Sequence, residues 1–247
     1  MTKRKFGLPE SMKDAITHYC PGCGHGIIHR IIAEVIDELS IREITIGIAP
    51  IGCAVLAYDY LSIDMSEAPH GRTPAVATGI KRVQPDKIVF TYQGDGDLAA
   101  IGTGEIIHTA NRAENITTIF VNNAVYGMTG GQMAPTTLLK QKTKTTPYGR
   151  EVKEAGFPMR VPEMLKSLEG VAYLARETVT SPKNIVRLKK YIKRAFEVQA
   201  RKLGFSLVEA LSPCPVNLRL KPIDALRWVE EYMVPFYPLG EIKDDKL

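Results

Sequence analysis

The chain has 247 residues, of which 45% are hydrophobic and 24% charged, a composition typical of a globular protein. Its 32 basic and 27 acidic residues leave a net charge of +5, which fits anionic small ligands or an acidic protein partner and gives no reason to expect nucleic acid. No apolar run reaches the roughly 18–20 residues that a membrane span needs. The basic N-terminus lacks the apolar stretch of a secretory signal. We therefore expect a cytoplasmic protein, without a membrane or nucleic-acid partner, with one domain over residues 1–247.

Apolar, β-rich runs alternate with helix-period stretches along most of the chain. In chain order we expect a helix over 26–40, a strand over 44–50, a helix over 73–83, a strand over 87–93, a helix over 98–112, a strand over 116–122, a helix over 161–170, a strand over 171–176, a helix over 181–204, a strand over 205–211 and a helix over 222–233. This alternation predicts an α/β fold with a mostly parallel sheet and helices on both faces. Segment 127–160 is long for a connection, and such loops are usually functional or mobile.

Four residues that can carry chemistry follow four of the predicted strands: Cys53, Asp95, Asn123 and Cys214. Ligands of parallel sheets bind beyond the carboxyl ends of the strands. We therefore expect these four side chains to converge at one edge of the sheet.

The chain contains four cysteines, Cys20, Cys23, Cys53 and Cys214. In a large chain that we expect in the cytoplasm, metal binding or catalysis explains an even count better than disulfides do. Zinc and a [4Fe–4S] cluster both accept four thiolates. One local pair with two distant single cysteines favours a cluster over structural zinc, and unrelated thiols stay open as an alternative.

A second pattern is the run TYQGDGDLAAIG, residues 91–102, in which a strand leads through a tight turn into a helix. Residues 97–121 separate this turn from Asn122-Asn123, and the two motifs at this separation resemble the signature of thiamine diphosphate enzymes. Asp95, Asn123 and the Val125 carbonyl would then offer oxygen ligands to Mg²⁺, while the helix N-terminus favours a diphosphate. The alternative is a βαβ unit with two ordinary turns.

The motifs follow one another as CPGCG (20–24), IGC (51–53), HGR (70–72), GDGD (94–97), NNAVYGMTGGQ (122–132) and SPCP (212–215). In this order, from about residue 18 to residue 240, the chain resembles the β subunit of the 2-oxoacid:ferredoxin oxidoreductases. The resemblance implies a thiamine diphosphate-binding fold. It also implies oxidative decarboxylation of a 2-oxoacid, with the acyl group passed to coenzyme A and the electrons passed through [4Fe–4S] to ferredoxin.

The same resemblance implies the residues of the site. The cluster ligands would be Cys20, Cys23, Cys53 and Cys214, and the Mg²⁺ ligands Asp95, Asn123 and Val125. The residues that line thiamine diphosphate would be Ile51, Gly52, Cys53, Ala54, His70, Gly71, Gly96, Asp97, Gly127 and Met128. His70 is the candidate for a catalytic side chain, and we expect the other histidines to be structural or on the surface, namely His18, His25, His29 and His108.

Charged residues near these motifs have two interpretations each. Arg72 and Lys81 could neutralise phosphate or substrate charge, or form ordinary ion pairs. The glutamate that activates thiamine lies on the partner α subunit in this family, with Glu67 and Glu105 as alternatives within the chain. We therefore expect the chain to be inactive without an α subunit, and the resemblance adds γ and δ subunits or their fused equivalents.

The motifs specify the class of reaction more closely than they specify the substrate. The motifs NNAVYGMTGGQ and YPLG (237–240) resemble the branched-chain and 2-oxoglutarate members of the family more than the pyruvate members. We expect a branched-chain 2-oxoacid such as 2-oxoisovalerate, with 2-oxoglutarate or pyruvate as alternatives. The basic loop 140–150 is either a solvated loop or a contact for coenzyme A or ferredoxin. Two other functions stay open: a cluster-free thiamine diphosphate decarboxylase or synthase, and a zinc-stabilised scaffold subunit.

Overall fold

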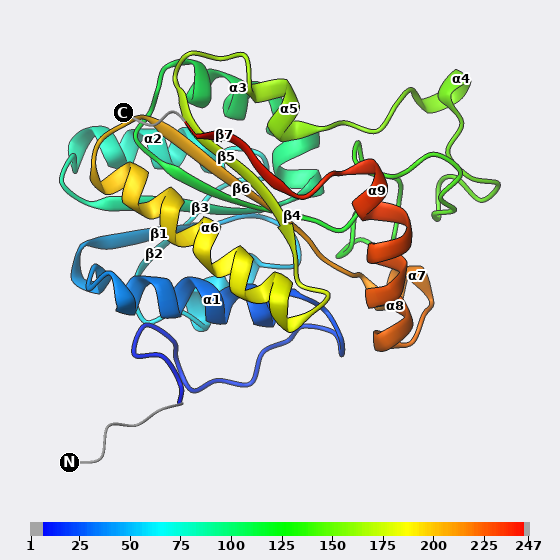
Figure 1. Ribbon diagram of the computed structural model, residues 1–247, viewed down its shortest axis with the longest axis horizontal. Coiled ribbons are helices and arrows are strands. Elements are labelled where there is room, and N and C mark those ends of the chain that lie inside the picture. Colours follow the sequence, from blue (N-terminus) through cyan, green and yellow to red (C-terminus); the bar gives the residue numbers. More distant parts are fainter. Residues whose placement is uncertain (1–6, 245–247) are drawn as a thin grey trace.

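A computed structural model describes residues 7–244, which contain a seven-stranded sheet in the order β2-β1-β3-β4-β6-β5-β7 (Figure 1). The strands are β1 (Thr45–Ala49), β2 (Asp64–Glu67), β3 (Ile88–Gly94), β4 (Thr117–Asn122), β5 (Val171–Thr178), β6 (Phe205–Leu211) and β7 (Gly240–Asp244). Neighbouring strands are parallel except for β7, which pairs antiparallel with β5. The predicted α/β fold with a mostly parallel sheet is confirmed.

Helices cover both faces of this sheet (Figure 1). Helices α1 (His25–Glu38) and α6 (Pro182–Ala200) pack on one face, and α2 (Thr73–Val83), α3 (Thr103–Asn111) and α5 (Val161–Leu165) pack on the other. Shorter helices lie in the connections: α4 (Val152–Ala155), α7 (Pro215–Leu218), α8 (Pro222–Trp228) and α9 (Val234–Phe236). Within residues 7–244, none of the helices is both long and apolar enough to cross a bilayer.

The two faces of the sheet follow from the alternation of side chains along each strand. In β3, Phe90 and Tyr92 join the core beneath α1 and α6, whereas Val89 joins the core beneath α2. Both faces of the central strands are therefore apolar, as expected for a parallel sheet covered by helices. Helix α6 begins where the sequence predicts, because the Ser181 side chain accepts a hydrogen bond from the Asn184 N–H.

Three expected helices differ from the structure. The run 98–112 starts as the π-helix η3 (Asp97–Ile101) and becomes α-helical at Thr103, because Gly102 interrupts it. The run 222–233 contains α8 and then the π-helix η4 (Val229–Met233), which precedes Pro235. Proline lacks the N–H that a continuing α-helix would bond. The third helix, expected over 161–170, ends at Leu165.

The two edge strands, β2 and β7, are not among the predicted strands. Their sequences are DMSE and GEIKD, which lack the apolar alternation of a half-buried strand. Charged residues are common on edge strands because they discourage pairing with other chains. The charged residues that suit these segments to the edge of the sheet also leave them without the apolar alternation by which strands are predicted.

A buried ionic network joins three elements beside the end of β4. Arg176 of β5 is fully buried and its guanidinium contacts the carboxylates of Glu209 in β6, at 2.6 Å, and Glu163 in α5, also at 2.6 Å. The Asn122 amide donates to the second oxygen of Glu209 at 2.7 Å. Burial raises the pKa of the Glu209 carboxyl, and the Arg176 charge opposes that rise. The network therefore fixes the first residue of the Asn122-Asn123 turn.

Replacing the central cation of this network tests its contribution. Arg176→Met should lower the free energy of unfolding by about 3–5 kcal/mol, because it leaves the Glu209 carboxylate buried without a counter-charge. The difference in unfolding free energy between this variant and the unmodified chain should be largest at neutral pH. It should shrink as the pH falls, since a proton on Glu209 removes the buried charge. Urea denaturation at several pH values measures both effects.

The matched control is Arg194→Met, which removes an arginine from the partly exposed ion pair with Asp244. A surface pair contributes about 0–1 kcal/mol, so this variant should unfold nearly as the unmodified chain does. Equal losses of unfolding free energy in Arg176→Met and Arg194→Met would show that the buried Arg176 contributes no more to stability than a partly exposed arginine does.

Candidate active site

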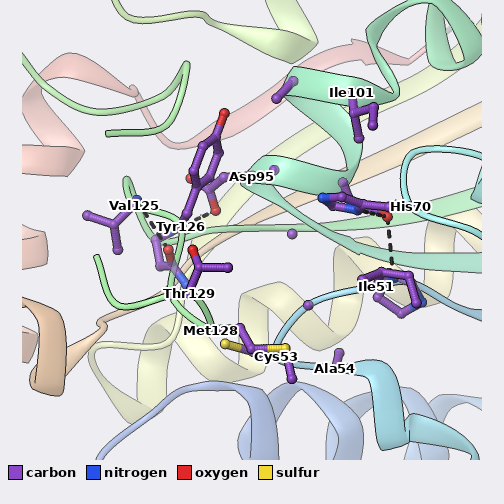
Figure 2. A pocket seen from close by; sticks show the side chains of 18 of the residues that line it. Ile51, Cys53, Ala54, His70, Asp95, Ile101, Val125, Tyr126, Met128 and Thr129 are labelled. Atoms are coloured by element: carbon purple, nitrogen blue, oxygen red, sulfur yellow. Dashed lines mark hydrogen bonds and ion pairs between the residues drawn. The ribbon is translucent and has the colours of Figure 1, made fainter. Parts of the chain in front are cut away.

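A cavity of about 250 Å³ opens at the carboxyl ends of β1, β3 and β4. Figure 2 shows Val125 and Thr129 on one side of it, His70 on the other and Cys53 at its base. The strand order makes β1, β3, β4 and β6 successive neighbours, so the expected convergence of their end loops occurs. All of the predicted cofactor and Mg²⁺ residues line this cavity except Gly71, which lies behind its wall.

Asp97 is the main organiser of the cavity wall. Its side chain is 1% exposed, and both carboxylate oxygens accept hydrogen bonds from other segments of the chain. The donors are the Gly71 N–H at 2.9 Å, His70 Nδ1 at 2.9 Å, the Thr73 hydroxyl at 3.0 Å, Gln93 Nε2 at 2.8 Å and the Ile51 N–H at 3.4 Å. One carboxylate therefore joins the loop after β1, the start of α2 and strand β3.

His70, the predicted catalytic candidate, is oriented by this carboxylate. Because a carboxylate can only accept, Nδ1 of His70 carries the proton that bonds Asp97. The ring lines the cavity, and none of the described residues hydrogen-bonds its Nε2. The second ring nitrogen is therefore left to accept a hydrogen bond from a group bound in the cavity.

Asp95 holds the loop of Asn123 and Ala124 in the opposite wall of the cavity. It is 2% exposed and accepts hydrogen bonds from the Asn123 N–H at 3.1 Å, the Ala124 N–H at 2.9 Å and the Thr136 hydroxyl. Burial raises the pKa of the Asp95 carboxyl to about 7, although these hydrogen bonds lower it. Across residues 7–244, no cationic side chain pairs with Asp95. When ionised, the Asp95 carboxylate is therefore buried without a counter-charge.

The four cysteines form no disulfide, interact with one another, and reach the cavity through Cys53. A Cβ atom at Gly127 would lie 3.1 Å from Cys53 Sγ and 3.8 Å from Cys214 Sγ, so both sulfurs face this glycine. Burial, followed by the neighbouring thiols, raises the pKa of Cys23 to about 11 and that of Cys53 to about 12. At neutral pH these groups are thiols unless a metal centre takes up their charge.

The arrangement of these groups differs from a single-ion site. Within the part of the chain that the structure describes, no three His, Cys, Asp or Glu side chains close on one point where they would hold a metal ion. The sulfurs of Cys53 and Cys214 both lie on the side of Gly127 where a Cβ atom would stand.

Of the other four histidines, two are on the surface and two are buried. His108 and His18 are exposed, although His18 Nε2 bonds the Cys53 carbonyl at 2.8 Å. His25 and His29 are buried, and burial lowers their pKa values to about 4 and about 3. Both are therefore neutral at pH 7. His25 also lines the cavity and bonds the Tyr92 hydroxyl at 2.7 Å, a contact that sequence reasoning missed.

The remaining candidate charges lie away from the cavity. Arg72 pairs with Glu105, and Glu67 is exposed at the end of β2. Lys81 is 7% exposed, and its ammonium donates to the carbonyls of Pro85 and Lys87. The alternative of an ordinary ion pair is therefore what the contacts support for Arg72, whereas Lys81 bonds backbone carbonyls and forms no ion pair within the described residues. Among the described residues, the cavity wall includes no glutamate.

Several further residues line the cavity that sequence reasoning did not identify: His25, Pro50, Gly94, Ala100, Ile101, Tyr126 and Thr129. Tyr126 and Thr129 belong to the motif NNAVYGMTGGQ, so their motif position was the available signal. Ala100 and Ile101 gave no signal, because they reach the cavity through the π-helix η3.

The long segment 127–160 is held in place by Arg150. This side chain is 4% exposed and donates to backbone carbonyls on both sides of it. The acceptors are the carbonyls of Pro135, Thr137, Ala155, Gly156 and Phe157. The expectation of a solvated basic loop over 140–150 is therefore wrong for Arg150, whose charge is used inside the segment.

A second cavity, of about 700 Å³, lies beside the Cys214 loop. It is lined by Lys142, Lys144 and Arg219 together with Gly130 and Asn217, among others. No acidic side chain of the described residues contributes to its wall. The cavity is therefore suited to an anionic group.

Comparison with known proteins agrees with this arrangement. Residues 51–210 match the family of the thiamine pyrophosphate enzyme, C-terminal TPP binding domain. Ketoisovalerate oxidoreductase subunit VorA of Methanothermobacter thermautotrophicus is 46% identical over 99% of this chain and 53% of its own length. The chain thus spans about half the length of this relative. The 2-oxoglutarate synthase subunit KorB of Methanocaldococcus jannaschii is 37% identical over 95% of this chain and 85% of its own length.

A solved structure is similar over the whole chain. The 2-oxoglutarate:ferredoxin oxidoreductase from Magnetococcus marinus matches with a TM-score of 0.83 and 27% identity, covering 100% of this chain and 87% of that chain. The predicted thiamine diphosphate-binding fold is thereby confirmed. The chain belongs to the family of 2-oxoacid:ferredoxin oxidoreductase subunits that carry the thiamine pyrophosphate-binding domain.

Proposed function

We propose that this chain is the β-type subunit of a 2-oxoacid:ferredoxin oxidoreductase, with thiamine diphosphate and Mg²⁺ in the first cavity and a [4Fe–4S] cluster on the four cysteines. One observation carries the proposal: Cys53 and the Asp95–Asp97 turn line the same cavity, while the sulfurs of Cys53 and Cys214 approach the same side of Gly127. A redox centre and an organic cofactor would thus share a wall.

The Asp95 turn fits a magnesium diphosphate. Asp95 supplies a carboxylate, Asn123 a side-chain oxygen and Val125 a backbone carbonyl, which are the hard oxygen ligands that Mg²⁺ prefers. The buried charge of Asp95, which no described cation offsets, is what a bound divalent cation would balance. Thiamine diphosphate supplies the carbanion and the electron sink for decarboxylation. His70, oriented by Asp97, would position a polar group of the cofactor or substrate.

The cysteines fit a cluster better than a single zinc ion. A [4Fe–4S] cluster takes one thiolate on each of four irons, and this chain brings four cysteines near enough that neighbouring thiols raise the pKa of Cys23 and Cys53. Cluster assembly would require Cys23 and Cys53 to lose protons that they hold at neutral pH in the metal-free chain. A cluster-free thiamine enzyme would leave this concentration of buried thiols without a role.

Partner subunits are supported by the cavity rim. Ile101 and Met128 are 48% and 58% exposed where they line the cavity, an arrangement that suits burial against another chain. We propose that an α subunit covers this rim and brings the glutamate that activates thiamine. The basic second cavity, with Lys142, Lys144 and Arg219, is the candidate contact for coenzyme A or the acidic surface of ferredoxin.

We propose a branched-chain 2-oxoacid such as 2-oxoisovalerate as substrate. The support is the relative identity, which is 46% to the ketoisovalerate subunit VorA and 37% to the 2-oxoglutarate subunit KorB. Activity of the chain with its partner subunits on 2-oxoisovalerate, 2-oxoglutarate and pyruvate, with coenzyme A and ferredoxin, tests this choice. A preference for 2-oxoglutarate or pyruvate would overturn the substrate while leaving the reaction class in place.

Anaerobic metal and cofactor analysis of the full chain, purified with its partner subunits, is the primary test. We expect about four irons and one thiamine diphosphate per copy of this chain, beyond the iron that other subunits hold. Zinc in place of iron would remove electron transfer from the chain. Iron without thiamine diphosphate would separate the cysteines from the proposed catalysis.

Asp95→Ala should weaken Mg²⁺-dependent binding of thiamine diphosphate by at least about 10–100-fold, the range known for residues that only support metal ligands. The iron content should stay unchanged, because Asp95 contacts the loop of Asn123 and Ala124 rather than a cysteine. Isothermal titration with the cofactor and Mg²⁺ measures the affinity. Unchanged affinity would reject Asp95 as a magnesium ligand.

Cys214→Ser gives the reciprocal result. It should remove the cluster absorbance and most of the iron, because a serine hydroxyl is a poor ligand for an iron–sulfur centre. Binding of thiamine diphosphate should persist, since Cys214 is not among the residues lining the first cavity. Each variant thus serves as the control for the other. Full iron content in Cys214→Ser would exclude Cys214 as a ligand.

A further inference from the structure

Asn217 connects the Cys214 loop to the wall of the cofactor cavity. It lies three residues after Cys214, in α7, and its Nδ2 is 3.2 Å from Cys214 Sγ. The same nitrogen is 3.0 Å from the carbonyl oxygen of Gly127. One side-chain amide thus donates its two hydrogens to a candidate cluster ligand and to the loop that lines the cavity.

The position of this amide is fixed by close packing. Gly131 has a φ of +86°, and a Cβ atom there would lie 2.6 Å from Asn217 Oδ1. A side chain at residue 131 would therefore displace the amide, so glycine is required for this contact as well as for the backbone conformation. Asn217 is held between the Cys214 loop on one side and the loop 127–131 on the other.

Cys214 is distinguished from the other cysteines by this contact. Among the described residues, it is the one cysteine whose sulfur receives a side-chain hydrogen bond.

Donors to a cluster sulfur change the energy of reduction. Reduction adds one negative charge to the cluster, and part of that charge resides on the thiolate sulfurs. An N–H aimed at a sulfur is favoured more by the reduced state than by the oxidised state, which raises the reduction potential. The amide of Asn217 has the geometry for this effect.

We propose that Asn217 is a positioning residue that raises the reduction potential of the cluster through its hydrogen bond to Cys214. This inference rests on the proposed function, because it requires a cluster bound by Cys214. The bond to Gly127 holds the amide in register with the cofactor loop, so the residue that tunes the electron acceptor also fixes its position beside the cavity.

The test is a redox titration of the full chain, reconstituted anaerobically with iron and sulfide and followed by electron paramagnetic resonance. Dithionite supplies the electron and is oxidised, the cluster gains one electron, and the amide keeps its protons. Two variants remove the donor: Asn217→Leu, which leaves no polar group, and Asn217→Asp, which keeps the shape and adds a negative charge. The control is Val216→Ala, which changes the neighbouring, exposed side chain.

We expect Asn217→Leu to retain its iron and to shift the reduction equilibrium about tenfold toward the oxidised cluster, which is about 59 mV for one electron. Asn217→Asp should shift it further in the same direction, because the carboxylate repels the added electron. Val216→Ala should titrate as the unmodified chain does. This graded order follows from the charge at residue 217 and would not arise from a purely structural defect.

Equal potentials in the unmodified chain and both Asn217 variants would overturn the inference. Loss of the cluster from both variants would also overturn it, because Asn217 would then be required for assembly rather than for the potential. Failure of the proposed function is a separate outcome, since the unmodified chain itself would then bind no [4Fe–4S] cluster.

Discussion

The buried carboxylate of Asp97 is the constraint on which the cavity depends. It accepts hydrogen bonds from the loop after β1, from the start of α2 and from Gln93 in β3, so three separate segments are held at one point. Two residues earlier, Asp95 fastens the loop after β4 in the same manner. A single turn between β3 and η3 therefore positions both walls of the cavity.

The desolvation cost of burying a carboxylate is offset differently at Asp97 and at Asp95. Asp97 is surrounded by five donors from the protein, which together replace the water that the carboxylate loses. Asp95 receives fewer donors, and burial shifts its pKa to about 7. A carboxylate that the protein leaves incompletely compensated in a cavity wall is suited to a cation that arrives with a ligand. The turn thus combines a permanent anchor with a site that is completed on binding.

The central strands were predictable from local patterns, whereas most of the named cavity residues came from the resemblance of their motifs to a known family. Buried strands such as β6 are rich in apolar and β-forming residues, and the ends of parallel strands must share an edge. The edge strands β2 and β7 were missed because charged edges carry no such pattern. His25 and Asn217 were missed for another reason: each acts through a partner distant in sequence, Tyr92 for one and Gly127 for the other. Single-sequence reasoning finds motifs, and it does not find the contacts between them.

The strand order brings the proposed thiamine diphosphate site and the proposed cluster site close together. The loops after β1 and β6 carry Cys53 and Cys214, and they flank the loops after β3 and β4 that carry Asp95 and Asn123. In the loop after β4, Gly127 lies so close to Cys53 and Cys214 that any side chain there would meet the sulfurs of both. Cys53 itself lines the cavity, so a cofactor bound there would lie directly beside one of the proposed cluster ligands. The Asn217 amide bonds both the Gly127 carbonyl and Cys214 Sγ, so it ties the loop after β4 to the loop after β6.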